Sequence, residues 1–246
     1  MTLRIEAPTV IETPLYENRL EVSENMEERR QTFIQQRLLD MAPTVTLGQP
    51  QCWSLTSIAR QKNQSLPAEM ALLLDEADFY VLQIASSFRP QREARVKWAR
   101  VDIYMEPTSG QHQPLAFDLY PREIYDEKGS DLTLTIEPGF SFRAFGTNVE
   151  AKLGQALTTI RLKRVEPVVV AYGLLQPGCG WDYQRSHQKP LEGIQVGYLI
   201  VKKPHSAGAV RMVMDVRAEV STPSGLFGMR VNEQDQAQRT VVVCDD

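Results

Sequence analysis

The sequence lacks the short motifs that mark common catalytic and nucleotide-binding sites. It contains no Walker-type phosphate loop and no G-x-G-x-x-G, H-E-x-x-H, G-x-S-x-G or C-x-x-C pattern. These absences argue against nucleotide enzymes, zinc metalloproteases and α/β-hydrolases. They still allow an enzyme whose site is assembled from scattered residues, so the sequence favours a non-catalytic protein without excluding catalysis.

Cysteine is also scarce, and the chain has no excess of positive charge. Cys52, Cys179 and Cys244 are an odd number at wide spacing, which is a poor disulfide framework and indicates a reducing compartment. The net charge of -4 gives no reason to expect binding to nucleic acid or to anionic lipid. Nucleic acid is therefore an improbable partner.

No apolar stretch is long enough to span a bilayer as a helix. The longest one, at residues 165–175, is far short of the ~20 residues required. Residues 1–14 lack the basic start and apolar core of a signal peptide. We therefore expect a cytoplasmic protein that meets a membrane only if its β-hairpins rearrange.

A period of two is the main pattern that the sequence does show, and 15 prolines punctuate it. In residues 210–220 one face carries Val210, Met212, Met214, Val216, Ala218 and Val220, and the other Arg211, Asp215, Arg217 and Glu219. Residues 101–105, 115–120 and 132–136 alternate similarly, whereas 168–175 and 197–201 are apolar on both faces and predict central strands. For a chain of 246 residues this predicts an antiparallel β-sandwich of about eight or nine strands.

The first fifty residues predict an N-terminal arm with one helix. Asn25 can cap a helix over residues 26–41, with Glu28 three positions on, and Pro43 would end it. The prediction thus divides the chain into an arm (1–50), a sandwich (51–231) and a polar linker with a short last strand (232–246).

Two further segments are ambiguous between helix and strand. Residues 70–79 are too short for periodicity to decide. Residues 147–157 predict a short helix, although Gly154 would cost it about 1 kcal/mol, and the following residues look extended.

Residues 174–193 predict a connection of roughly 18 residues, and connections of that length are uncommon and often functional. Within it Trp181 and Tyr183 would point the same way, with Arg185 and His187 continuing the alternation. The group forms either a platform for an acidic or planar partner, or, as we favour, a cover over a sheet edge with solvated cations.

The cysteines and histidines raise two possible chemical sites. Cys179 and His187 are eight residues apart and could form a nucleophile and base, but no orienting third group is evident. A buried or turn cysteine is the favoured interpretation. His112, His187 and His205 have no partner at a metal-ligand spacing, so we expect no metal and no cofactor.

A basic cluster with an aromatic residue lies at residues 89–100 and includes Arg92, Arg95 and Trp98. Such a mixture can bind an acidic protein or a phosphate backbone. Because the cluster spans an expected hairpin turn, solvated charges are the favoured interpretation.

The sequence therefore predicts a non-catalytic interaction, scaffold or assembly protein that uses loops and terminal arms to contact another protein or copies of itself. A hydrolase using Cys179 and His187 is one alternative. The other is an effector that inserts β-hairpins into membranes, suggested by the amphipathic strand at 209–220.

Overall fold

A computed structural model describes residues 13–22, 40–61, 63–136, 158–186, 190–223 and 225–244, with side chains outside 126–136 and 158–167. The chain divides into two compact units, residues 1–124 with 168–246, and residues 125–167. No described helix is both long and apolar enough to cross a bilayer.

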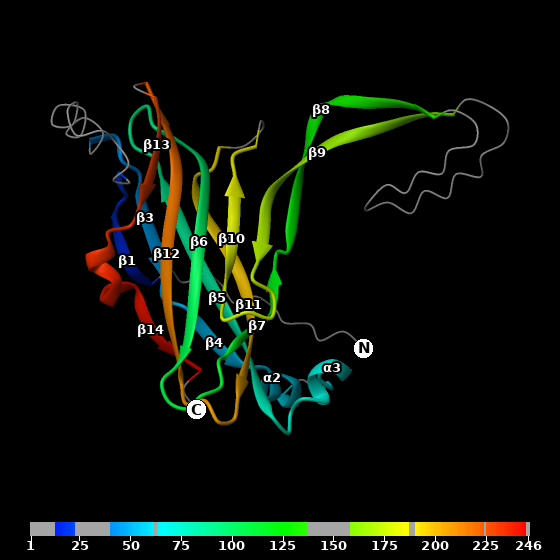
Figure 1. The fold of residues 1–246 in the computed structure, drawn as a ribbon, viewed down its shortest axis with the longest axis vertical. Coiled ribbons are helices and arrows are strands. Elements are labelled where there is room, and N and C mark those ends of the chain that lie inside the picture. The colour runs from blue at the N-terminus through cyan, green and yellow to red at the C-terminus, as the bar shows by residue number, and fades with distance from the viewer. Residues whose placement is uncertain are drawn as a thin grey trace. The chain divides into compact units, whose positions relative to one another are not determined.

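The described residues form fourteen strands and three short helices, against the eight or nine strands predicted (Figure 1). The strands are β1 (Pro14–Arg19), β2 (Glu21–Val22), β3 (Thr44–Gly48), β4 (Gln51–Ser54), β5 (Ala77–Arg89), β6 (Arg95–Pro107), β7 (Leu115–Tyr120), β8 (Glu123–Ile136), β9 (Thr158–Tyr172), β10 (Gly178–Gln184), β11 (Gly193–Pro204), β12 (Val210–Thr222), β13 (Gly225–Arg230) and β14 (Thr240–Val243). The helices are α2 (Leu55–Gln61), α3 (Ala68–Ala71) and the 3-10 helix η2 (Glu233–Arg239).

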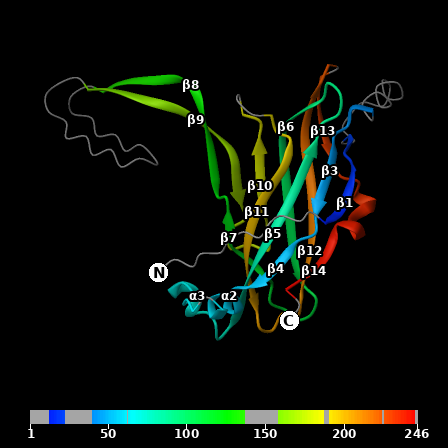
Figure 2. The ribbon, with the colours of Figure 1, turned by 180° about the vertical axis from the view of Figure 1, so that it is seen from behind.

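These strands build two antiparallel sheets, which confirms the predicted β-sandwich class. Sheet A has the order β1-β3-β5-β11-β7, with β4 also pairing with β5. Sheet B has the order β2-β13-β12-β6-β10-β9-β8, with β14 pairing with β12. Figure 2 shows β4 and β5 of sheet A from the side opposite to Figure 1.

The main core lies between the sheets and follows the predicted alternation. On β12 the six apolar residues predicted to share a face are all buried, none exposing more than 2% of its surface. On the same strand Arg211, Arg217 and Glu219 are exposed. The prediction for this strand is confirmed because one face packs on the core and the other meets water.

A second apolar cluster covers the other face of sheet A. Phe79 and Val81 of β5 pack there with Leu55 of α2 and Met70. Tyr198 and Ile200 of β11 contact this cluster, whereas the alternate residues Leu199 and Val201 enter the main core. The prediction that residues 197–201 are covered on both faces is confirmed.

The strand at residues 115–120 departs from its predicted alternation. Ala116 and Leu119 are buried in the main core, while Phe117 contacts Phe79 of the second cluster, with ring centroids 5.0 Å apart. The pairing with β11 shifts register between Ile200 and Val201. This irregularity moves successive side chains to the opposite face, so the predicted common face for Leu115, Phe117 and Leu119 is wrong.

Residues 174–193 differ most from their prediction. Residues 178–184 are strand β10 in the interior of sheet B, paired with β6 on one side and β9 on the other. The turn before β10 is short, and Gly173 and Leu175 adopt positive φ angles of 80° and 59° there. The expected 18-residue connection is therefore a turn, a strand and a second connection, of which residues 187–189 lie outside the described part.

The ends of the chain belong to the sandwich where they are described. On β1, Tyr16 is buried in the main core, and Leu20 follows it there. At the other end, Arg239 is buried and donates to the carbonyl of Met214 at 2.7 Å. The described parts of both ends therefore pack against the sandwich.

The structure describes only some of the segments that were predicted to be helical or ambiguous. Most of the predicted helix at 26–41 lies outside the described residues, as does the short helix predicted over 147–157. The ambiguous residues 70–79 contain the end of α3 and the start of β5. The extended segment predicted after residue 157 is confirmed as β9.

Candidate functional site

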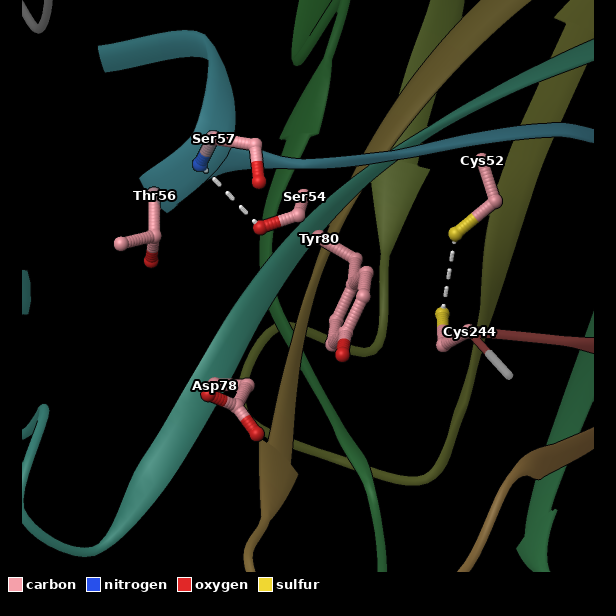
Figure 3. Close-up of a pocket in the computed structure, with 7 residues that line it drawn as sticks. All are labelled: Cys52, Ser54, Thr56, Ser57, Asp78, Tyr80 and Cys244. Carbon is pink, nitrogen blue, oxygen red and sulfur yellow. Dashed lines mark hydrogen bonds between the residues drawn. The ribbon is translucent and has the colours of Figure 1, made fainter. Parts of the chain in front are cut away.

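Two cysteines that are 192 residues apart in sequence lie next to each other in the fold. Cys52 is on β4, which pairs with β5 of sheet A, and Cys244 directly follows β14, which pairs with β12 of sheet B. Their Sγ atoms are 3.2 Å apart, within hydrogen-bonding distance for sulfur (Figure 3). The two sheets thus bring together two thiols that are widely separated in the sequence.

Both thiols line a pocket of about 500 Å³. The other lining residues carry polar groups and are Ser54, Thr56, Ser57, Asp78 and Tyr80 (Figure 3). Ser54 Oγ accepts a hydrogen bond from the backbone N–H of Ser57 at 3.3 Å, which caps the start of α2. The pocket therefore combines hydroxyl, carboxylate and thiol groups at one end of the sandwich.

The environment of Cys52 favours its ionised form. Its pKa is lowered, chiefly by the side-chain hydrogen bond that it shares with Cys244, and the positive charge of Lys203 acts in the same direction. Burial opposes this shift. Because the thiolate is the reactive form of cysteine, a lowered pKa favours reaction at Cys52 over reaction at a thiol whose pKa is raised.

Cys179 has the opposite environment. It is 1% exposed, and burial alone raises the pKa of its thiol to about 12. His187, the proposed base, lies outside the described residues. The hypothesis of a hydrolase using Cys179 thus loses its nucleophile, because a buried neutral thiol is inert.

The predicted aromatic platform is not exposed. Trp181 and Tyr183 do point to the same side, as expected, but both are buried in the main core. The Trp181 indole N–H donates to the carbonyl of Pro121 at 3.0 Å. Arg185 is exposed, so the structure separates it from the two aromatic side chains instead of joining them in one surface.

The basic cluster lies at a hairpin turn, between β5 and β6. Arg92 is exposed with a positive φ of 51°, and Arg95 donates to the carbonyls of Arg92 and Ala94 at 3.2 and 2.7 Å. Trp98 is half-buried and lies under the guanidinium of Arg100, 5.5 Å from its ring centroid. The hydrogen bonds of Arg95 thus stabilise the turn between β5 and β6.

A polar network that the sequence analysis missed lies on the outer face of sheet B. The carboxylate of Asp102 is almost fully buried and accepts from Arg217 Nη2 at 2.7 Å and from the Tyr172 hydroxyl. Beside it Arg100 makes a two-point ion pair with Asp182, at 2.7 and 2.6 Å. Burial and Asp102 raise the pKa of Tyr172, so the hydroxyl stays neutral as a donor.

Within the described ranges, no three histidine, cysteine or acidic side chains are grouped to hold a metal ion. His112 and His205 nevertheless lie on neighbouring loops, since His112 Nδ1 is 2.8 Å from Ser206 Oγ. His205 Nε2 is 3.5 Å from the carboxylate of Asp78.

Comparisons with known proteins identify no family. No protein-family profile and no curated protein sequence matches the chain. Among solved structures it is similar to the NetB toxin of Clostridium perfringens in its membrane-inserted form, at 7% identity and a TM-score of 0.31, over 82% of this chain and 92% of that one. It is also similar to Clostridium perfringens delta-toxin, at 6% identity and a TM-score of 0.23, over 78% and 89%. Scores this low support no conclusion about shared activity.

Proposed function

We propose that this chain is a non-catalytic assembly protein whose copies join through a β-ribbon. The ribbon consists of the strand segments 125–136 of β8 and 158–167 of β9, which belong to the second compact unit. The observation that carries the proposal is the position of β8 at the end of the strand order of sheet B. An edge strand of this length offers a row of backbone groups to another chain.

The ribbon has a second edge on β9. Strand β10 pairs with β9 only from Val169 to Tyr172, so in the described part of the chain residues 158–168 of β9 adjoin β8 alone. The β8 edge of one copy can therefore pair with the β9 edge of the next by strand addition. Because the two edges differ, such pairing would lead to a ring or a filament.

Exposed apolar side chains on strands of the first compact unit also support an interaction role. Among the described residues, Tyr104, Tyr120, Ile124, Leu174 and Leu175 expose between 45% and 69% of their surface. They lie on β6, β7, the start of β8 and the turn between β9 and β10. Exposed apolar surface of this kind is available for contact with another chain.

The test compares the intact chain with two single variants of β8. Leu134→Lys places a charge at an apolar position of the ribbon, and Thr133→Lys is the matched control at the neighbouring polar position. Light scattering should show a concentration-dependent oligomer for the wild type and for Thr133→Lys, and a monomer for Leu134→Lys. A wild-type chain that stays monomeric at all concentrations would rule out self-assembly.

Insertion of the ribbon into a lipid bilayer is a second candidate, favoured by the sequence of its strands. From Leu132 every even-numbered residue is apolar or proline as far as Ala144, and the odd ones between them are polar or glycine; positions 137–144 lie outside the described residues. A membrane-spanning strand needs about 9–11 residues with this alternation. β8 and β9 have 14 and 15 residues.

Dye release from anionic and neutral liposomes separates the two candidates. Insertion predicts release by the wild type and by Thr133→Lys, and its loss in Leu134→Lys, because a lysine on the lipid-facing side costs about 2–4 kcal/mol at mid-bilayer. Oligomers that form without any release, even after limited proteolysis, would favour assembly and contradict insertion.

A further inference from the structure

Cys52 and Cys244 belong to segments of different sheets, and strand pairing fixes the backbone at or next to each of them. Cys52 is in register with Leu82 of β5, and Val243, just before Cys244, is in register with Val210 of β12. Cys244 itself has a φ of 55°, a conformation that non-glycine residues rarely adopt. The chain is thus held in an unfavourable backbone conformation at the residue that faces Cys52.

We propose that Cys52 and Cys244 are a redox-responsive pair, which a low-molecular-weight disulfide oxidises to an intramolecular disulfide linking sheet A to sheet B. This inference does not depend on the ribbon. The Sγ atoms are 3.2 Å apart and need to approach by roughly 1.2 Å to reach the covalent S–S length of about 2.05 Å.

Of the three thiols, Cys52 is the one that is only partly buried, whereas Cys179 and Cys244 are buried. Cys52 is half-buried and, with Cys244, lines the 500 Å³ pocket. Cys179 is enclosed in the main core. Lys203 lies beside this pocket, since its ammonium nitrogen is 5.4 Å from the ring centroid of Tyr80, one of the lining residues.

The reaction is an ordinary two-step thiol–disulfide exchange. The Cys52 thiolate attacks one sulfur of glutathione disulfide, forming a mixed disulfide and releasing one glutathione thiolate. Cys244 then loses its proton and attacks Sγ of Cys52, which releases the second glutathione. In total, two protein thiols are oxidised, one small disulfide is reduced, and two molecules of glutathione leave with the two protons.

The experiment incubates the intact protein with reduced and oxidised glutathione at graded ratios, followed by trapping and peptide mass spectrometry without reduction. The expected product is a cross-linked peptide pair containing Cys52 and Cys244, with Cys179 still a thiol. Thermal unfolding of the oxidised protein should shift upward by roughly 5–10 °C, because the link closes a very long loop.

Single variants distinguish disulfide formation between Cys52 and Cys244 from general oxidation of thiols. Cys244→Ser should stop at a mixed disulfide on Cys52, and Cys179→Ala should cross-link as the wild type does. A wild-type protein that accumulates a stable glutathione adduct without closing, that links Cys179 instead, or that keeps both thiols reduced in excess glutathione disulfide would overturn the proposal. None of these results would alter the oligomer test of the ribbon.

Discussion

The buried carboxylate of Asp102 connects three strands of sheet B. It sits on β6 and holds Arg217 of β12 and Tyr172 of β9, so three strands meet at one carboxylate. Burying a charge is costly unless it is paired and hydrogen-bonded, and these contacts satisfy it. Removing the carboxylate takes away the acceptor of Arg217 and leaves the Tyr172 hydroxyl only the carbonyl of Val101, at 3.3 Å.

We predict that Asp102→Ala lowers the free energy of unfolding by about 3 kcal/mol, because it breaks a partly buried ion pair. Glu106→Ala is the matched control, since Glu106 lies on the same strand and pairs with Arg211 of β12 where both side chains are about half exposed. The control should cost no more than about 1 kcal/mol. Urea unfolding measures both, and equal losses would contradict the assigned role of Asp102.

A second prediction at this scale concerns alkaline pH. Burial and the hydrogen bond to Asp235 raise the pKa of Tyr16 from 10.0 to about 12. The unfolded chain therefore releases this proton first as the pH rises. The stabilisation is complete below pH 10 and is lost as the pH approaches 12.

Tyr16→Phe should accordingly make the decline in unfolding free energy between pH 10 and 12 less steep, as measured by urea unfolding at several pH values. Tyr104→Phe is the control, because that side chain is half exposed on β6. A wild-type slope in Tyr16→Phe would contradict the assigned proton linkage.

At the scale of elements, β10 and β11 pack through one close contact between the sheets. A Cβ atom on Gly197 of β11 would lie 2.6 Å from the ring of Trp181, whereas one on Gly178 of β10 would lie 3.6 Å from the ring of Tyr104. The first contact is too short for any side chain, and the second is ordinary van der Waals contact.

Gly197→Ala should therefore destabilise the protein by about 1–3 kcal/mol through overpacking, while Gly178→Ala should change stability little. Thermal unfolding combined with tryptophan fluorescence would detect both the loss and the displacement of Trp181. Equal stability of the two variants would mean that β11 and β10 do not pack as described.

The elements also show where sequence patterns succeed. The long alternation of β12 identified its buried face residue by residue, because one face of that strand packs on the core and the other meets water. In β10 the same alternation was present in Cys179, Trp181 and Tyr183, but the flanking glycines and the charged residues after it led to a predicted loop. The short length of β10 gave too few residues for the period to outweigh those turn signals.

At the scale of the whole molecule, residues that are far apart in the chain come together in ways that the sequence patterns do not indicate. Cys52 and Cys244 meet because β4 of sheet A lies beside the end of β14 of sheet B, and no local spacing in the sequence indicates that proximity. The network around Asp102 likewise draws on β6, β9 and β12. The candidate site could therefore not be predicted from the sequence, although the sandwich class could.

The ribbon gives the whole molecule its proposed way of acting, since its two strand edges can pair copies without any catalytic group. Hydrogen–deuterium exchange at increasing protein concentration tests this most directly. We predict that backbone amides of residues 123–136 become protected as copies associate, while the edge strand β1 exchanges unchanged. Association that leaves residues 123–136 unprotected and protects another surface would contradict it.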